Sequence, residues 1–221
     1  MIDEARHVEA YVRLLHEKFD LAYPINPHLK QLLDDTLAES RWDFTYLGMQ
    51  VLIEGVALAS FGLIRDQSKN PLAASVNAYV MQDEARHVAF GRLALRDYYP
   101  QLTQKERDER EEFAVQGCYL LRDRFRAEEV WETLGLPVDE CAGYVDRSEL
   151  MQIFRTNLFT RIVPTMKDIG LWGPKVQKAY ADMGVIGFAD INLESVMAHD
   201  EKVGAEFDAR NTEILRVAQL A

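Results

Sequence analysis

The chain has 221 residues, of which 48% are hydrophobic and 28% are charged, a composition typical of a globular protein rather than a disordered one. This length allows one large domain with a substantial core. The formal net charge of -11 argues against a nucleic-acid backbone as a partner, because like charges repel.

The cysteines and the N-terminus predict the cellular location. Cys118 and Cys141 lack the Cys-x-x-Cys spacing of zinc and redox sites, so we expect two reduced thiols, as in cytosolic proteins. The first residues are charged and do not form a signal peptide. We also expect no apolar run that approaches the ~20 residues of a membrane span. The prediction is a cytoplasmic protein that contacts no membrane.

Hydrophobic periodicity predicts helices along the first half of the chain. The first helix covers residues 1 to about 19, where apolar side chains repeat at helical spacing: Val8, Tyr11, Leu14, Leu15 and Phe19. Two prolines, Pro24 and Pro27, then break the chain before a short helix from about 28 to 39. Long helices are expected over 41–65 and 72–98, with Pro71 well placed at the start of the second.

The second half is also predicted to be helical. Thr103 and Glu106 have the spacing of a capping box, which favours a helix from 104 to about 133. Further helices are expected over 146–168, bent or ended near Pro164, over 173–184, and over 192–218. No convincing strand is predicted. We therefore expect an all-α protein with one helical domain over 1–221.

One six-residue sequence, Asp-Glu-Ala-Arg-His-Val, occurs twice at an offset of 80 residues. In each copy a Glu and a His lie three residues apart and face the same side of a helix. The pairs are Glu4 with His7 and Glu84 with His87. A carboxylate beside an imidazole suits a first-row metal ion. One such pair is usually a surface ion pair, but two copies on two helices predict a metal site.

Three further carboxylates belong to the predicted site. Glu54 lies on an otherwise apolar helix face, and a buried carboxylate must be neutral, paired or bound to metal. Asp3 and Asp83 each precede a Glu of the repeated motif. A carboxylate at that position can accept the second N–H of a ligand histidine and fix its tautomer. The alternative is that both aspartates lie on a solvated helix face.

At these residues the sequence resembles the ferritin-like di-iron carboxylate superfamily. The doubled Asp-Glu-x-Arg-His is similar to bacterial multicomponent monooxygenase hydroxylases and to soluble acyl-carrier-protein desaturases. The segment 53–55, followed by 59–61, is similar to the ribonucleotide reductase small subunit and related ligand-binding oxidases. The resemblance covers roughly 1–100 and implies a four-helix bundle with additional C-terminal helices.

The resemblance implies a centre of two iron ions, with manganese as an alternative at one or both positions. Its ligands would include Glu4, His7, Glu54, Glu84 and His87. The implied activity is activation of dioxygen to oxidise or hydroxylate a small apolar organic substrate. An electron-donor protein is a candidate partner, and a homodimer is the default expectation.

The superfamily has a fourth Glu, on a helix before the first Glu-x-x-His, that this chain lacks. With the spacing of the second half, it would fall about 26 residues before Met1. A truncated chain that lacks the first bundle helix, a site completed in another way and a degenerate site are the alternatives. We favour truncation, because a helix that starts on its own ligand motif is an unusual beginning. Substitutes in the last helix would be Glu194, His199 or Asp200.

Tyr11 carries the main alternative function. It lies one turn after His7, at the offset that the radical tyrosine has in the reductase small subunit. A radical-generating subunit is therefore one alternative, while a tyrosine packed in the core is the simpler interpretation. A metal-free helical interaction protein with a vestigial site is another alternative, and iron storage is the least favoured.

Overall fold

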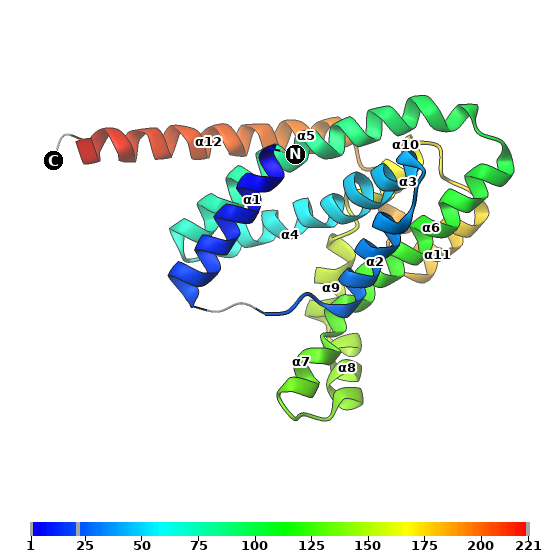
Figure 1. Ribbon diagram of the computed structural model, residues 1–221, viewed down its shortest axis with the longest axis horizontal. Coiled ribbons are helices and arrows are strands. Elements are labelled where there is room, and N and C mark those ends of the chain that lie inside the picture. Colours follow the sequence, from blue (N-terminus) through cyan, green and yellow to red (C-terminus); the bar gives the residue numbers. More distant parts are fainter. Residues whose placement is uncertain (1, 21–22, 220–221) are drawn as a thin grey trace. The chain divides into compact units, whose positions relative to one another are not determined.

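The computed structural model describes residues 2–20 and 23–219, and every regular element in this part of the chain is a helix (Figure 1). The predicted all-α class is thus confirmed. The α-helices are α1 (Ile2–Arg13), α2 (Pro27–Ala38), α3 (Trp42–Tyr46), α4 (Glu54–Gln67), α5 (Pro71–Tyr98), α6 (Gln104–Asp123), α7 (Glu128–Thr133), α8 (Val138–Arg147), α9 (Glu149–Asn157), α10 (Ile162–Asp168), α11 (Pro174–Asp182) and α12 (Leu193–Gln219).

The chain divides into two compact units. Unit 1 comprises Met1–Tyr23, Ser60–His87 and Asn192–Ala221, and unit 2 comprises Pro24–Ala59 and Val88–Ile191. Helices α4 and α5 each run from one unit into the other.

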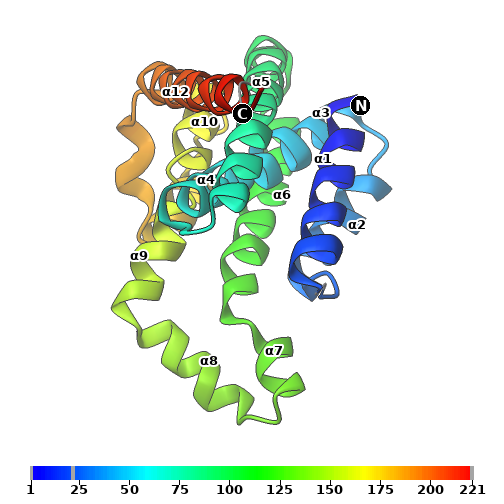
Figure 2. The same cartoon turned by 90° about the vertical axis from the view of Figure 1, so that its left-hand side faces the viewer.

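In unit 1, α1 lies beside the first part of α5, and the first part of α12 crosses α5 (Figures 1 and 2). The approach of α12 to α5 is close at Gly204, where an added Cβ atom would lie 3.0 Å from the side-chain nitrogen of Gln82. Helix α1 continues as a π-helical segment, Leu14–Phe19, and ends at Asp20, whose φ of 50° is left-handed. The predicted first helix is therefore present, with a wider final turn.

The apolar residues of this first helix do not all face the interior. His7 and Leu14 are buried, whereas a separate apolar stripe is exposed along the helix: Val8, Val12, Leu15 and Phe19. Residues 8, 12, 15 and 19 follow the spacing of one helix face. The sequence periodicity identified the helix correctly but combined two faces that have different surroundings.

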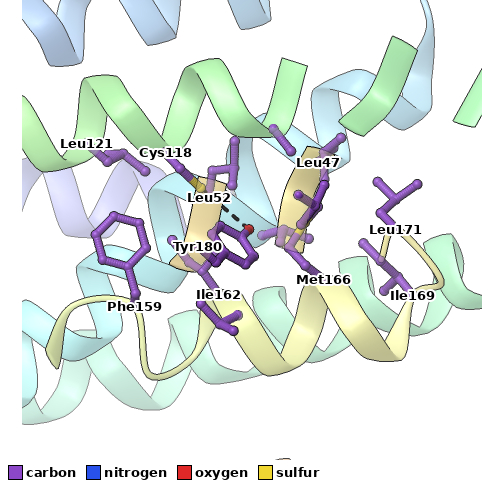
Figure 3. Packing of buried hydrophobic residues seen from close by; sticks show 14 of the residues in the cluster. Leu47, Leu52, Cys118, Leu121, Phe159, Ile162, Met166, Ile169, Leu171 and Tyr180 are labelled. Atoms are coloured by element: carbon purple, nitrogen blue, oxygen red, sulfur yellow. Dashed lines mark hydrogen bonds between the residues drawn. The ribbon is translucent and has the colours of Figure 1, made fainter. Parts of the chain in front are cut away.

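Helix α6 has the central position in unit 2, where it packs against α2, α11 and the π-helical segment Leu47–Ile53. Figure 3 shows the apolar core, to which α6, α10, α11 and the π-helical segment contribute. Within it, the sulfur of Cys118 on α6 and the hydroxyl of Tyr180 on α11 are hydrogen-bonded at 3.6 Å. Both cysteines are free, Cys118 buried and Cys141 partly exposed.

The predicted helix over 104–133 is interrupted. It begins as expected, with the capping box of Thr103 and Glu106. It ends at Asp123 and is followed by a 3₁₀ turn, Arg124–Arg126, and by Ala127 with a left-handed φ of 53°. Because a left-handed residue redirects the chain, α7 starts in a new direction (Figure 2). No glycine marks this break in the sequence.

The predicted helix over 146–168 was wrong in its limits. Helix α8 already occupies Val138–Arg147, and Ser148 has extended backbone angles and caps α9 by accepting a hydrogen bond from the Met151 N–H. Helix α10 begins at Ile162, so Pro164 lies in its first turn rather than at a helix end. Proline is tolerated there because a first-turn N–H has no intrahelical partner.

The predicted long helix over 41–65 is present, although its middle is π-helical at Leu47–Ile53. The expectation about membrane spans was wrong for this stretch. Trp42–Gln67, 26 residues long, is apolar enough to cross a membrane by length and composition. A buried helix of a soluble core meets the same criterion, so this observation alone is weak support for a membrane location.

Candidate metal centre

The two copies of the repeated motif face each other within unit 1. Glu4 and His7 lie in the first two turns of α1, and Glu84 and His87 lie on the part of α5 beside it. The i, i+3 spacing places each Glu next to its own His. Ligand atoms of Glu4, Glu84 and His87 all lie within 4.8 Å of one another.

Each of the two glutamates spans both histidines. One oxygen of Glu84 lies 3.2 Å from Nδ1 of His7, and its other oxygen lies 3.3 Å from Nδ1 of His87. Glu4 has the same relation, with one oxygen 2.9 Å from Nδ1 of His87 and the other 3.6 Å from Nδ1 of His7. The sequence repeat thus produces an approximately symmetric group of two carboxylates between two imidazoles.

The aspartates of the motif contact the histidine of the opposite copy. Oδ2 of Asp83 lies 3.0 Å from Nε2 of His7, and Oδ2 of Asp3 lies 3.4 Å from Nε2 of His87. An acceptor at Nε2 favours the tautomer that leaves a lone pair on Nδ1. Nδ1 is the nitrogen that faces the glutamates, so both rings can present a lone pair toward the centre of the cluster.

The arginines of the motif hold these aspartates. Arg6 pairs with Asp3 and lies 3.5 Å from Asp83, and Arg86 pairs with Asp83. Both guanidinium groups are largely exposed, so these ion pairs add little stability on their own. Their effect is to fix the carboxylates that contact the histidines.

Burial differs across the cluster. The side chain of Glu84 is 8% exposed, whereas that of Glu4 is 51% exposed. Burial, and then the nearby carboxylate of Glu4, raise the pKa of Glu84. Nδ1 of His7 is buried and accepts or donates no hydrogen bond within the described residues. A buried nitrogen without a hydrogen bond, next to two carboxylates, fits a position that would coordinate a cation.

Tyr11 is on the same side of α1, in a packed environment. Its hydroxyl donates a hydrogen bond to Oδ1 of Asn77 at 3.0 Å, and its ring stacks on Phe61 with centroids 5.8 Å apart. Burial, with a smaller contribution from Glu84, raises the pKa of the Tyr11 hydroxyl. Asn77 was not identified from the sequence, although it lies two helical turns before Glu84 on α5 and so shares its face.

Glu54 belongs to unit 2, where it is the first residue of α4 and is 7% exposed. The π-helical segment Leu47–Ile53 ends immediately before it. Such segments are frequent at functional sites. The burial agrees with the sequence interpretation, and a ligand role for Glu54 stays a prediction. In the described residues, the group of adjacent ligand atoms includes none of the substitutes Glu194, His199 and Asp200.

No protein-family model, curated protein or solved structure matches this chain.

Proposed function

We propose that this chain is a di-iron carboxylate protein that activates dioxygen to oxidise or hydroxylate a small apolar organic substrate. The main support is the way in which Glu4 and Glu84 each span both histidines in unit 1. Glu4, Glu84, His7 and His87 would hold the cations through carboxylate oxygens and imidazole nitrogens, the donor types of such a centre.

The residues present fit such a centre. The donor set of carboxylate oxygen and imidazole nitrogen suits iron or manganese. Without a cation, Nδ1 of His7 would be a buried polar atom with no hydrogen bond, which costs free energy. Asp3 and Asp83 would orient the histidine ligands from behind. A ligand role for Glu54, which lies in unit 2, rests on the resemblance of the sequence alone.

The ferritin-like bundle would need a further helix that brings the fourth carboxylate. The exposed stripe Val8, Val12, Leu15 and Phe19 is an apolar helix face of the kind that packs against another helix. Glu4, at the start of the same helix, is the most exposed glutamate of the cluster. A helix covering this stripe would therefore enclose the open side of the cluster, and we expect the fourth Glu on it.

When bound, two iron ions would supply the electrons that reduce dioxygen. The residues of the chain hold and orient the cations and exclude water from the buried side of the cluster. A cavity of about 260 Å³ in unit 1, lined by Leu14, Leu72 and Val76 among others, is a candidate position for an apolar substrate. An electron-donor protein would complete the cycle.

Dioxygen consumption tests this proposal. Wild-type protein that is loaded with Fe(II) under anaerobic conditions should consume dioxygen once dioxygen is added. At equal protein concentration, the Glu84→Gln variant should consume dioxygen at least ten-fold more slowly. Glu9→Gln, an exposed position on α1, is the control with the same charge change. Equal rates in the two variants, or a rate no higher than that of free Fe(II), would exclude a role for the cluster.

A radical-generating role of Tyr11 is the second candidate. The observation that favours it is the burial of the hydroxyl near Glu84. Its hydrogen bond to Asn77 also fits a tyrosine that merely packs in the interior. An electron paramagnetic resonance signal that disappears in Tyr11→Phe would support the radical role, and a signal that persists would assign the radical to another residue.

A further inference from the structure

Unit 2 contains a cavity of about 450 Å³ that is lined in part by arginines. This volume is within the range of cavities that hold small organic molecules. Its lining residues include three arginines, Arg122, Arg126 and Arg155, together with two acidic residues, Asp123 and Asp146. An excess of positive charge in a cavity wall is unexpected in a chain with a net charge of -11.

Asp146 holds two of these guanidinium groups together. It accepts a hydrogen bond from Nη1 of Arg155 at 2.8 Å, and its other oxygen lies 3.3 Å from Nε of Arg126. Arg126 also pairs with Glu128, which lies 2.9 Å from Nη1 and is not part of the cavity wall. The third guanidinium, of Arg122, is bonded through two nitrogens to its neighbour Asp123.

Within the described residues, the guanidinium groups of Arg126 and Arg155 each keep N–H donors without a hydrogen bond. The side chain of Arg155 is 11% exposed, and within the described residues one of its five N–H groups donates a hydrogen bond to the protein. In Arg126, Nε lies against Asp146 and Nη1 against Glu128, which within the described residues leaves Nη2 as the nitrogen for a ligand. Buried, unused N–H donors are costly, and a guanidinium matches the two oxygens of a carboxylate or phosphate group.

Another part of the wall is apolar and is formed by Phe159, Met183 and Val185. Phe159 and Val185 belong to the buried core. A ligand that fills this cavity therefore needs an anionic head and an apolar body. An inorganic ion alone would leave the apolar part of the volume unfilled.

We propose that this cavity binds a small organic oxyanion, with its head on Arg126 and Arg155 and its apolar body against Phe159, Met183 and Val185. The site is separate from the proposed di-iron function and does not depend on it. A carboxylate and a phosphate ester share the head-group chemistry, so the choice between them is made by experiment.

Calorimetric titration of the full chain, in a buffer that contains a metal chelator, tests the proposal. The probes are hexanoate and hexyl phosphate, with hexan-1-ol as the neutral ligand of the same chain length and acetate and inorganic phosphate as heads alone. At least one of the two six-carbon anions should bind at least ten-fold more tightly than hexan-1-ol. The same anion should also bind at least ten-fold more tightly than its head group alone, which is acetate for hexanoate and inorganic phosphate for hexyl phosphate. Binding of the alcohol as tightly as both anions would overturn the proposal.

Two variants locate the site. Arg155→Gln should weaken binding of the tighter anion ten-fold or more, while Arg147→Gln, an exposed position on α8 outside the cavity wall, should leave it within two-fold. Equal weakening by the two variants would mean that only the net charge matters and would overturn the proposal. If Arg155→Gln does not fold by circular dichroism, Arg126→Gln is tested in its place under the same criterion.

Discussion

Asp43 on α3 and Arg110 on α6 form an ion pair inside unit 2. Nε of Arg110 donates to Oδ2 of Asp43 at 2.8 Å, both side chains are buried, and the guanidinium lies 4.6 Å from the ring centroid of Phe44. Replacing one member of such a pair leaves a buried charge without its partner. We therefore expect Asp43→Ala to lower the free energy of unfolding by about 3–5 kcal/mol.

Chemical denaturation of Asp43→Ala and of Asp182→Ala measures this effect. Asp182 pairs with Lys178 on the surface of α11, where both side chains are exposed, so its loss should cost less than about 1 kcal/mol. A loss for Asp43→Ala as small as that for Asp182→Ala would show that the buried pair contributes little.

Glu111 and Glu112 are neighbours on α6 whose pKa values are shifted in opposite directions. Glu111 is buried, which raises its pKa above the ordinary value of 4.5, although its carboxylate accepts a hydrogen bond from the Gly173 N–H at 2.7 Å. Glu112 is on the surface, and its hydrogen bond with Lys175 lowers its pKa. A raised pKa means that the folded protein binds the proton more tightly than the unfolded chain.

The stabilisation from protonated Glu111 is therefore complete below pH 4.5 and is lost as pH rises through the folded pKa. Relative to wild type, Glu111→Gln should become more stable as pH rises from 4 to 7. Glu112→Gln should become less stable over the same interval, because ionised Glu112 stabilises the fold at higher pH. Melting temperatures at four pH values test both signs, and a parallel response of the two variants would contradict the assignment.

At the residue scale, only the interactions between residues close in sequence could be predicted. The Glu–His pairs and the Thr103 capping box depend on spacing within one helix and were predictable. The Asn77 contact to Tyr11 and the Asp43–Arg110 pair join residues 66 and 67 positions apart. Nothing in a single sequence identifies such a partner.

At the scale of the elements, two helical glycines differ in what surrounds them. An added Cβ at Gly117 on α6 would lie 2.6 Å from Cδ1 of the buried Leu52 and 3.2 Å from Cδ1 of Leu32. An added Cβ at Gly62 on α4 would make an ordinary contact with Met81 at 3.5 Å. Glycine at the first position permits the close packing of α6, and at the second it serves no steric need.

Alanine substitutions at these two glycines should have opposite effects. At Gly117, overpacking of about 1–3 kcal/mol should exceed the gain of up to about 1 kcal/mol from helix propensity, so Gly117→Ala is destabilising. Gly62→Ala should stabilise by about 0.5–1 kcal/mol. Denaturation midpoints compare the two. If Gly117→Ala is stabilising, the Leu52 side chain can move away without loss of stability, which would contradict this packing.

The existence of the helices was predictable, but several of their limits were not. Periodicity found the helices around α1, α4, α5 and α12, because each is long and carries repeated apolar positions. The break at Ala127 lacks the glycine that usually accompanies a left-handed residue. The π-helical segments Leu14–Phe19 and Leu47–Ile53 change the hydrogen-bond register without any change in residue type, so the sequence carries no sign of them.

For the whole molecule, the central feature is that two distant copies of one motif form one cluster. The repeat predicted that α1 and the first part of α5 would bring the two pairs together, and unit 1 has that arrangement. The crossed contacts of Asp3 with His87 and of Asp83 with His7 depend on how the two helices pack, which spacing within one helix does not determine. The identity of the metal, the number of metal ions and the role of Glu54 stay predictions.

Anaerobic calorimetric titration with Fe(II) tests the central claim most directly. Wild type should bind up to two ions per chain with saturation, and so should His16→Ala, which changes an exposed histidine of the same segment. His7→Ala and Glu84→Gln should each weaken binding ten-fold or more, which corresponds to about 1.4 kcal/mol. Absence of saturable binding in wild type, or equal affinities in all four proteins, would contradict a metal centre at this cluster.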